Sequence, residues 1–539
     1  MNRVCENLGA AGVCCGLWVS ACGFGSMEGT AGSGPSKDGA IGDGAKGPGY
    51  YVPTDLGTAP VEPAPDGPGY HPFVVAEHDP LSTFAADVDT ASYDGFRRSI
   101  GRGVLPSPET VRVEEYVNYF AYEYPLVAHD AKVPFAINVA AAPHLLDRGT
   151  TLMRIGIQGK SAPPAHEEHE GTNLVFLVDT SGSMASADKL PLVQRVLSEA
   201  LTVLQPTDSV SLVTYASGAK VVLPPTAVSE NATLTSAIDS LEAGGSTAGG
   251  AGLELAYEQA ESAFVEGGLN HVVLCTDGDF NIGPSSTEEL VRLIEDRRTT
   301  GITLTALGFG WDNLNDSMME EVSNAGNGIY ALITDEDQAT RYANQRLLST
   351  MTHIAKDVKI QVEFNPALVY AYRLIGYDNR SLADGDFRDD VVDAGEIGAG
   401  HQVTALYELA LERAELPQLE SAPALAAGEP FDGDVEVAAG DLALVKVRYK
   451  GVDAAATDLA KEVRVSLAPE ALAKSVAGLD RDFRWAAAIA TFAEILRDSP
   501  YVEPSALAEV DAIVMAEQSD DPDRSEFGQL WPAARRLFE

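Results

Sequence analysis

The stretch LVFLVDTSGS, residues 174–183, decides the fold. Its first half, residues 174–178, is an unbroken apolar run, which predicts a strand buried on both faces of a parallel sheet. Its second half places Asp179, Ser181 and Ser183 directly after that strand. Because alternate residues of an extended segment face the same side, these three oxygen-bearing side chains are expected to point together.

Two further oxygen-bearing residues follow similar signals. Thr247 lies in the run GGSTAGG, residues 244–250, and Asp277 comes soon after the apolar residues 272–274. Ligands of an open parallel sheet bind beyond the carboxyl ends of its strands. Oxygen ligands suit a hard cation, so Mg²⁺ is favoured over zinc, with Mn²⁺ or Ca²⁺ as alternatives. The predicted metal ligands are Asp179, Ser181, Ser183, Thr247 and Asp277.

Strand and helix patterns alternate around these residues. Helical patterns between residues 189 and 351 are separated by strand-like runs at 209–214, 271–275, 302–308 and 329–333. Such alternation requires parallel strands joined by right-handed crossovers. The sequence therefore predicts an α/β fold with a doubly wound, mostly parallel, Rossmann-like sheet.

The motif Asp-x-Ser-x-Ser, followed by a distant Thr and a distant Asp, resembles the metal-ion-dependent adhesion site of von Willebrand factor type A domains. The resemblance covers about residues 172–352. It implies that the five residues hold the metal, and that an Asp or Glu of a partner protein completes the metal shell. Five other segments resemble a bacterial subfamily of type A lipoproteins: Thr83–Phe84, Asp87–Tyr93, Arg112–Phe120, Leu374–Tyr377 and Asp393–His401.

Strand-like segments lie on both sides of the type A region. Residues 133–141 and 151–158 precede it, and five such segments follow between residues 358 and 467. We interpret them as one β-sandwich interrupted by the type A domain; two separate β regions are the alternative. The expected division is a signal peptide (1–21), a Gly/Pro-rich disordered tether (22–80), an N-terminal helical segment (81–130), sandwich strands (131–165), the type A domain (172–352), a β-rich domain (355–475) and C-terminal helices (480–539).

Two helical signals frame the chain. Ser107-Pro108-Glu109 is typical of a helix start, and Val113, Tyr116, Val117 and Phe120 would then share one apolar face. Near the C-terminus, helices are expected over residues 485–496, 505–516 and 526–537.

The first residues predict export and lipidation. A weakly polar run ends in Val19-Ser20-Ala21-Cys22, which resembles a bacterial lipobox with Cys22 as the lipidated residue. A poor transmembrane helix or a mistaken start site are the alternatives. Gly23 does not resemble an inner-membrane retention signal, so we favour the outer membrane of the cell envelope. Cys275, in a predicted buried strand, is expected to be a core residue.

The charge balance limits the partners. The chain has 37 Lys and Arg against 80 Asp and Glu, a formal charge of −43. Nucleic acids and anionic lipid surfaces require basic residues, so neither is expected as a partner. Membrane contact is expected only through the N-terminal lipid anchor.

Other motifs do not support catalysis. His166–Glu170 departs from the zinc-protease spacing, and Asp384–Asp390 departs from the calcium-loop register, although a weak calcium site there stays open. No phosphate-binding loop or serine nucleophile elbow occurs. The main hypothesis is a non-enzymatic, surface-tethered, cation-dependent protein-binding module. A scaffold or assembly factor of an envelope complex is the alternative, and a metal-dependent hydrolase is a remote one.

Overall fold

The computed structural model describes residues 70–86, 89–128, 131–146, 148–161, 171–246, 250–278, 287–310, 315–378, 380–390, 394–417, 424–452, 454, 458–517 and 521–539. The expected signal peptide, Cys22 and most of the expected tether lie outside this part of the chain. None of the helices in the described ranges is long and apolar enough to cross a membrane.

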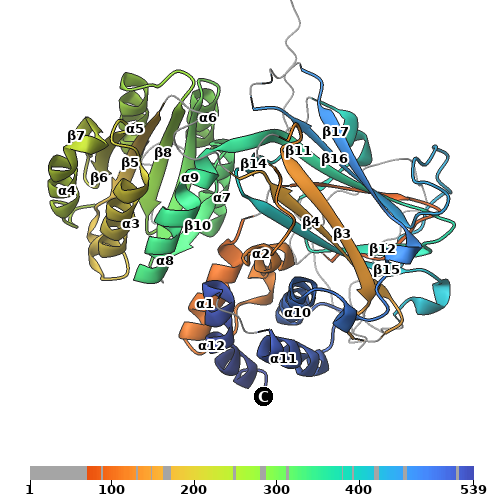
Figure 1. The fold of residues 1–539 in the computed structure, drawn as a ribbon. Coiled ribbons are helices and arrows are strands. Elements are labelled where there is room, and N and C mark those ends of the chain that lie inside the picture. Colours follow the sequence, from red (N-terminus) through yellow and green to blue (C-terminus); the bar gives the residue numbers. More distant parts are fainter. Residues whose placement is uncertain are drawn as a thin grey trace, which may run out of the picture. The chain divides into compact units, whose positions relative to one another are not determined.

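The type A region contains a six-stranded sheet in the order β10-β9-β8-β5-β6-β7 (Figure 1). All neighbouring strands are parallel except β6 and β7, which are antiparallel. The predicted parallel strands are therefore present, and β7 is an added edge strand. The bounds are β5 (Thr172–Asp179), β6 (Ser209–Tyr215), β7 (Ala219–Ala227), β8 (Leu269–Thr276), β9 (Ile302–Phe309) and β10 (Tyr330–Ile333).

Helices cover both faces of this sheet. One core contains Leu174, Phe176 and Val178 of β5, and the other contains Val175 and Leu177, so alternate residues of the strand face opposite helices. The first core includes α3 (Leu190–Val203), α4 (Asn231–Asp239), α8 (Glu336–Arg341) and α9 (Leu347–Met351), and the second includes α5 (Gly250–Ser262), α6 (Thr287–Arg298) and α7 (Asp316–Ala325). This arrangement confirms the doubly wound fold.

Two antiparallel sheets form the sandwich. One has the order β1-β12-β15-β4-β3, and the other β13-β2-β11-β16-β17, with β14 paired to β11. Strands from before and after the type A region are neighbours in both sheets, which confirms the insertion of the type A domain into a β-sandwich. The bounds are β1 (Val74–Val75), β2 (Leu81–Ala85), β3 (Phe135–Pro143), β4 (Thr151–Gly159), β11 (His353–Phe364), β12 (Ala371–Ile375), β13 (Ser381–Leu382), β14 (Ile397–Gly398), β15 (Gln402–Ala410), β16 (Ala443–Lys450) and β17 (Lys461–Leu467).

Two sequence expectations at the N-terminal side are wrong. Val74–Val75, assigned to the tether, forms β1, and Leu81–Ala85, assigned to a helical segment, forms β2. Both strands exist because they pair with distant strands: Val74 lies opposite Tyr372, and Phe84 lies opposite Ile360. Local sequence pattern does not report such pairing.

Helices from both ends of the described chain share one aromatic core. This core contains Phe96 and Tyr116 from the N-terminal side and Trp485, Phe492 and Phe527 from the C-terminal side. The bounds are α1 (Ala91–Gly101), α2 (Val113–Asn118), α10 (Arg481–Leu496), α11 (Leu507–Ala516) and α12 (Pro522–Arg536). The predicted apolar face of α2 is buried.

Some predicted helix boundaries differ in detail. Ser107 precedes a short 3-10 turn, Pro108–Thr110, and α2 begins later, at Val113. The last helical pattern before residue 351 is divided into α8 and α9 by a π-helical turn, Tyr342–Arg346. Further 3-10 turns are Gly182–Ala185, Val228–Glu230, Asp384–Arg388, Arg413–Glu415, Pro469–Ala471, Val476–Gly478 and Pro504–Ala506.

Candidate metal centre

The Asp-x-Ser-x-Ser motif lies at the carboxyl end of β5. Asp179 is the last residue of that strand and is fully buried, and Ser181 is 2% exposed. The backbone N–H of Ser181 donates to Asp179 Oδ1 at 2.7 Å, which folds the chain back over the carboxylate. The Oγ atoms of Ser181 and Ser183 lie 2.9 Å apart. One carboxylate and two hydroxyl groups therefore gather at this strand end.

The Gly-rich loop lies against the motif. Gly182 N–H donates to the carbonyl of Gly245 at 3.1 Å, and Gly244 N–H donates to the carbonyl of Thr180 at 2.8 Å. Gly245 has φ +93°, and a Cβ there would lie 2.7 Å from Ser217 Oγ, so the close approach requires glycine. Thr247 itself lies outside the described residues.

Asp277 follows β8, the parallel neighbour of β5. Its carboxylate is 2% exposed. Thr276, the residue before it, donates from Oγ1 to Asp179 Oδ2 at 3.3 Å, which joins the two strand ends. The described part of the chain thus brings Asp179, Ser181, Ser183 and Asp277 to one edge of the sheet.

The carboxylate of Asp179 lies in an environment that disfavours its negative charge. Burial raises the pKa of Asp179, the hydrogen bonds from Ser181 oppose that rise, and the nearby carboxylate of Asp277 raises it further. Two buried carboxylates next to each other are stabilised by a cation. A cation bound at this strand end would therefore favour the ionised form of Asp179.

The donor set fits a hard dication. Mg²⁺ takes about six oxygen ligands and keeps several waters, so a few carboxylate and hydroxyl oxygens suffice. In the described ranges, no group of three or more His, Cys, Asp or Glu side chains could hold a metal. A metal at this edge therefore needs the serine hydroxyls as well as the two carboxylates. Cys275 is buried in the core, as predicted, and burial raises the pKa of its thiol.

Lys189 is a residue of this site that the sequence did not single out. Its Nζ donates to Asp277 Oδ2 at 2.8 Å. Lys189 is also the N-cap residue of α3, where its side chain makes no cap hydrogen bond. An ion pair between residues separated by 88 positions leaves no local signal in the sequence.

Two carboxylates of the acidic loop at residues 384–390 are bound to different partners and do not form a common site. Asp384 accepts a hydrogen bond from Thr83 Oγ1 at 2.7 Å, and burial, with Asp79 nearby, raises its pKa to about 6. Asp390 pairs instead with Arg448 at 2.9 Å. This divergence gives no support to a calcium site. The His166–Glu170 stretch lies outside the described residues.

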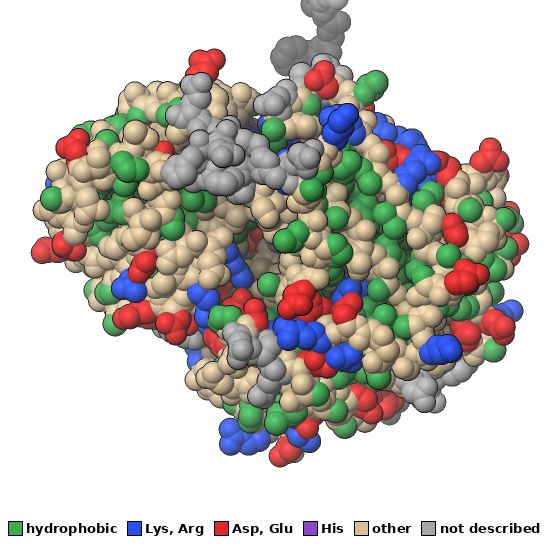
Figure 2. Space-filling view, in the orientation of Figure 1, with side chains coloured by type: hydrophobic (Ala, Val, Ile, Leu, Met, Phe, Trp, Pro, Cys, Tyr) green, Lys and Arg blue, Asp and Glu red, His purple; other side chains and the backbone are tan. Residues whose placement is uncertain are grey.

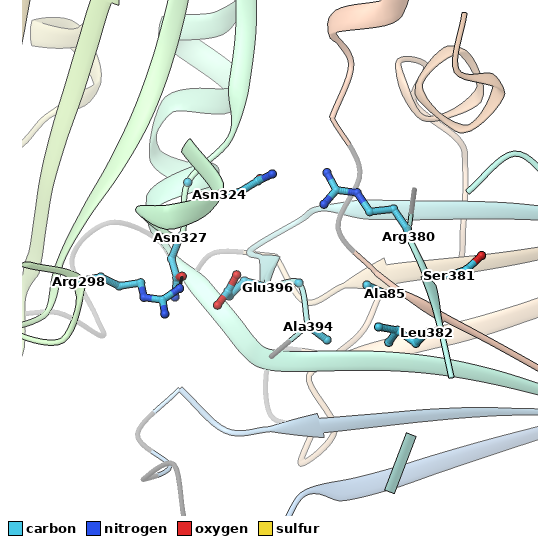
Figure 3. A pocket seen from close by; sticks show the side chains of 11 residues that line it. Ala85, Arg298, Asn324, Asn327, Arg380, Ser381, Leu382, Ala394 and Glu396 are labelled. Atoms are coloured by element: carbon cyan, nitrogen blue, oxygen red, sulfur yellow. Dashed lines mark hydrogen bonds between the residues drawn. The ribbon is translucent and has the colours of Figure 1, made fainter. Parts of the chain in front are cut away.

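A polar pocket of about 310 Å³ lies away from the candidate metal centre. Its lining includes Arg298, Asn327, Arg380 and Glu396, which Figure 3 labels. Arg298 Nη1 donates to Asn327 Oδ1 at 2.7 Å, and Arg380 pairs with Asp89 at 2.8 Å. The arginines are thus held by neighbouring residues of the protein.

The surface in Figure 2 shows how the charges are spread. Acidic and basic side chains are interspersed over this face, with hydrophobic side chains between them. The formal charge of −43 is therefore not gathered in one patch on the face shown.

Three family models match the chain. The von Willebrand factor type A domain matches residues 173–345, a model described as von Willebrand factor matches residues 68–154, and one described as Uncharacterized protein YfbK, C-terminal, matches residues 349–537.

Relatives of known sequence agree with these matches. The Uncharacterized protein YfbK of Escherichia coli (strain K12) is 38% identical over 473 residues, covering 85% of this chain and 79% of the relative. The Uncharacterized protein sll0103 of Synechocystis is 29% identical over 205 residues, covering 38% of this chain and 46% of the relative. Among solved structures, von Willebrand factor type A from Catenulispora acidiphila is 15% identical with a TM-score of 0.40, covering 75% of this chain and 98% of that chain.

Type A domains commonly mediate protein–protein interaction and commonly hold a divalent cation. The extent and identity of the match to YfbK, together with the family model over residues 349–537, reach well beyond the type A region. The chain therefore belongs to the YfbK family of proteins with a von Willebrand factor type A domain.

Proposed function

We propose that this protein is a surface-tethered, divalent-cation-dependent protein-binding module. The ion, Mg²⁺ by preference, is held by Asp179, Ser181, Ser183, Thr247 and Asp277. The observation that supports this most is the junction of two strand ends, where Thr276 hydrogen-bonds Asp179 and places Asp277 beside the motif. Buried carboxylates and paired hydroxyls at that junction form a suitable oxygen donor set.

Each protein group has a separate task in this proposal. Asp179 supplies a buried carboxylate whose orientation is fixed by Ser181 N–H at 2.7 Å. Ser181 and Ser183 supply oxygen without adding charge. A bound dication supplies a centre that accepts one more anionic oxygen, and a partner's Asp or Glu carboxylate is the proposed ligand. We assign no catalytic residue here, because the proposal uses both carboxylates, Asp179 and Asp277, as metal ligands.

Attachment to the cell envelope completes the proposal. Export and lipidation at Cys22 would tether the folded part through the segment before residue 70 and favour the outer membrane. The support is the lipobox-like sequence Val19-Ser20-Ala21-Cys22. Retention of the mature chain in detergent-extracted membranes, and its release when Cys22 is replaced by Ser, tests this part separately.

The main experiment compares the wild-type chain with Asp179→Ala. We expect wild-type chain, incubated with envelope extract in Mg²⁺, to retain a partner that a chelator elutes. We expect Asp179→Ala to lose both this partner and Mn²⁺ binding, measured by electron paramagnetic resonance. Equal capture in Mg²⁺ and in chelator would contradict the proposal.

The same experiment separates the competing functions. A scaffold that uses mainly its sandwich and helices would keep its partners in Asp179→Ala. A metal-dependent hydrolase would turn over a generic phosphoester and lose that turnover in Asp179→Ala.

A further inference from the structure

Lys189 lies where α3 begins, at the same strand-end edge as the metal motif. Its Nζ is 2.8 Å from Asp277 Oδ2, its side chain is 12% exposed, and that of Asp277 is 2% exposed. The ammonium group is therefore largely shielded from water. A shielded ion pair is stronger than one on the surface, so it affects the charge of the whole site.

The strand next to β8 makes room for the lysine stem. Gly310, directly after β9, has φ +90°, and a Cβ there would lie 2.7 Å from Lys189 Cε and 2.8 Å from Lys189 Cγ. The backbone N–H of Lys189 also donates to the carbonyl of Ser186 at 3.2 Å. The ammonium is thus positioned by the start of α3 and by the open space at Gly310.

Among the described residues, the buried charges that meet at this edge are the carboxylates of Asp179 and Asp277 and the ammonium of Lys189. With Lys189 present, a dication would leave the site with net positive charge. Without Lys189, the two carboxylates would balance a dication. The presence of this lysine therefore favours an anionic ligand at the site over a neutral one.

We propose that Lys189 is a built-in counterion of Asp277 that weakens the hold of this site on its cation and strengthens its hold on an incoming carboxylate. The proposal rests on the metal centre proposed above. Lys189 takes one oxygen of Asp277, so less negative charge remains for the cation. Lys189 also neutralises Asp277 when no cation is bound. It is a specificity-determining residue that acts through Asp277.

The test changes the charge but keeps the hydrogen bond. Lys189→Gln retains an N–H donor for Asp277 Oδ2 without the positive charge, and Lys189→Arg retains the charge. Lys461→Met, an exposed lysine on β17 of the sandwich, removes one charge far from the site and serves as the control. The binding of Mn²⁺ alone is measured by electron paramagnetic resonance on the full chain.

Acetate is the probe for the second half of the proposal. Acetate that replaces water on bound Mn²⁺ lowers the relaxation enhancement of water protons. We expect Lys189→Gln to bind Mn²⁺ about tenfold more tightly and acetate about tenfold more weakly, because it loses one nearby positive charge. Lys189→Arg and Lys461→Met should stay within about twofold of wild type for both probes.

The outcomes separate this inference from the metal centre itself. If wild type binds Mn²⁺ and Asp179→Ala does not, but Lys189→Gln has wild-type affinity for both probes, Lys189 only anchors α3 and the inference is wrong. If Asp179→Ala binds Mn²⁺ as wild type does, the metal centre is wrong. Circular dichroism and thermal unfolding confirm that each variant folds. If Lys189→Gln does not fold, Lys189→Met takes its place, and the inference then requires that this variant bind Mn²⁺ more tightly and acetate more weakly than wild type.

Discussion

Arg373 of β12 holds Glu494 of α10 through two hydrogen bonds, Nη1 to Oε1 at 2.9 Å and Nη2 to Oε2 at 3.0 Å. The same guanidinium also donates to Glu408 of β15 at 2.9 Å. Arg373 and Glu408 are fully buried. One arginine therefore joins the sandwich to the C-terminal helices.

Breaking this pair is expected to destabilise the protein strongly. Glu494→Leu leaves the guanidinium of Arg373 with one buried carboxylate fewer, and loss of one partner of a buried pair costs about 3–5 kcal/mol. The free energy of unfolding is measured by urea denaturation. Arg388→Met is the matched control, because Arg388 is 52% exposed and pairs with a 38% exposed Glu436.

The control should lose less than about 1 kcal/mol, as exposed ion pairs do. Equal losses in Glu494→Leu and Arg388→Met would show that the buried pair does not hold the helices to the sandwich.

The buried Glu408 that accepts from Arg373 is expected to make the stability of the protein sensitive to acid. Burial alone would raise the pKa of Glu408, but His144, Arg148 and Arg373 hold it at about 2. The unfolded chain titrates near the ordinary value of about 4.3, so the stability that Glu408 contributes is complete above that pH and is lost as pH falls through its folded pKa. Urea midpoints between pH 5 and pH 2 should fall more steeply for wild type than for Glu408→Gln. A variant curve parallel to wild type would rule out this contribution.

The sequence predicted the type A fold because its signals are local. The apolar run of residues 174–178 is long enough to identify a buried strand, and Asp179, Ser181 and Ser183 directly follow it. Strand β7 was missed because it contains Pro224 and Pro225. Proline is accepted there since β7 is an edge strand, whose outer side needs no ladder hydrogen bonds.

The remaining features depend on long-range contacts. Strand β2 is stabilised by pairing with β11 across the whole type A insertion, and Lys189 reaches Asp277 across 88 positions. The shared aromatic core of α1, α2 and α10–α12 joins the two ends of the described chain. Periodicity predicts that such helix faces are buried, but it does not predict which faces meet.

A buried histidine is expected to make the type A region less stable below neutral pH. Burial, with His353 nearby, lowers the pKa of His271 to about 3, and its ring lies 2.6 Å (Nδ1) from Thr303 Oγ1. As pH falls below about 6.5, His271 becomes protonated in the unfolded chain but stays neutral in the folded chain. Stability should therefore fall by up to about 1.4 kcal/mol per pH unit until the folded pKa is reached. His271→Gln should show a shallower slope between pH 6.5 and pH 4, and an unchanged slope would contradict the assignment.

Removal of the cation should be visible as a loss of thermal stability. A ligand that binds the folded state at a hundred times its dissociation constant stabilises it by about 2.7 kcal/mol. The melting temperature of wild type should therefore rise when Mg²⁺ replaces chelator. Asp179→Ala and Asp277→Ala should give the same melting temperature in both buffers, whereas Asp384→Ala, outside the site, should respond as wild type does. A rise of equal size in Asp179→Ala would place the stabilising ion elsewhere.

Two glycines of the type A region offer a matched test of packing. A Cβ at Gly328, between α7 and β10, would lie 1.9 Å from the carbonyl oxygen of Leu304 on β9, whereas a Cβ at Gly218 would meet nothing within 4 Å. Backbone atoms of a central strand move little, so Gly328→Ala should destabilise the type A region by about 3 kcal/mol. Gly218→Ala should change stability by less than about 0.5 kcal/mol. Urea unfolding of both full-length variants measures the difference, and Gly328→Ala within 1 kcal/mol of Gly218→Ala would show that the α7–β10 turn relaxes away from β9.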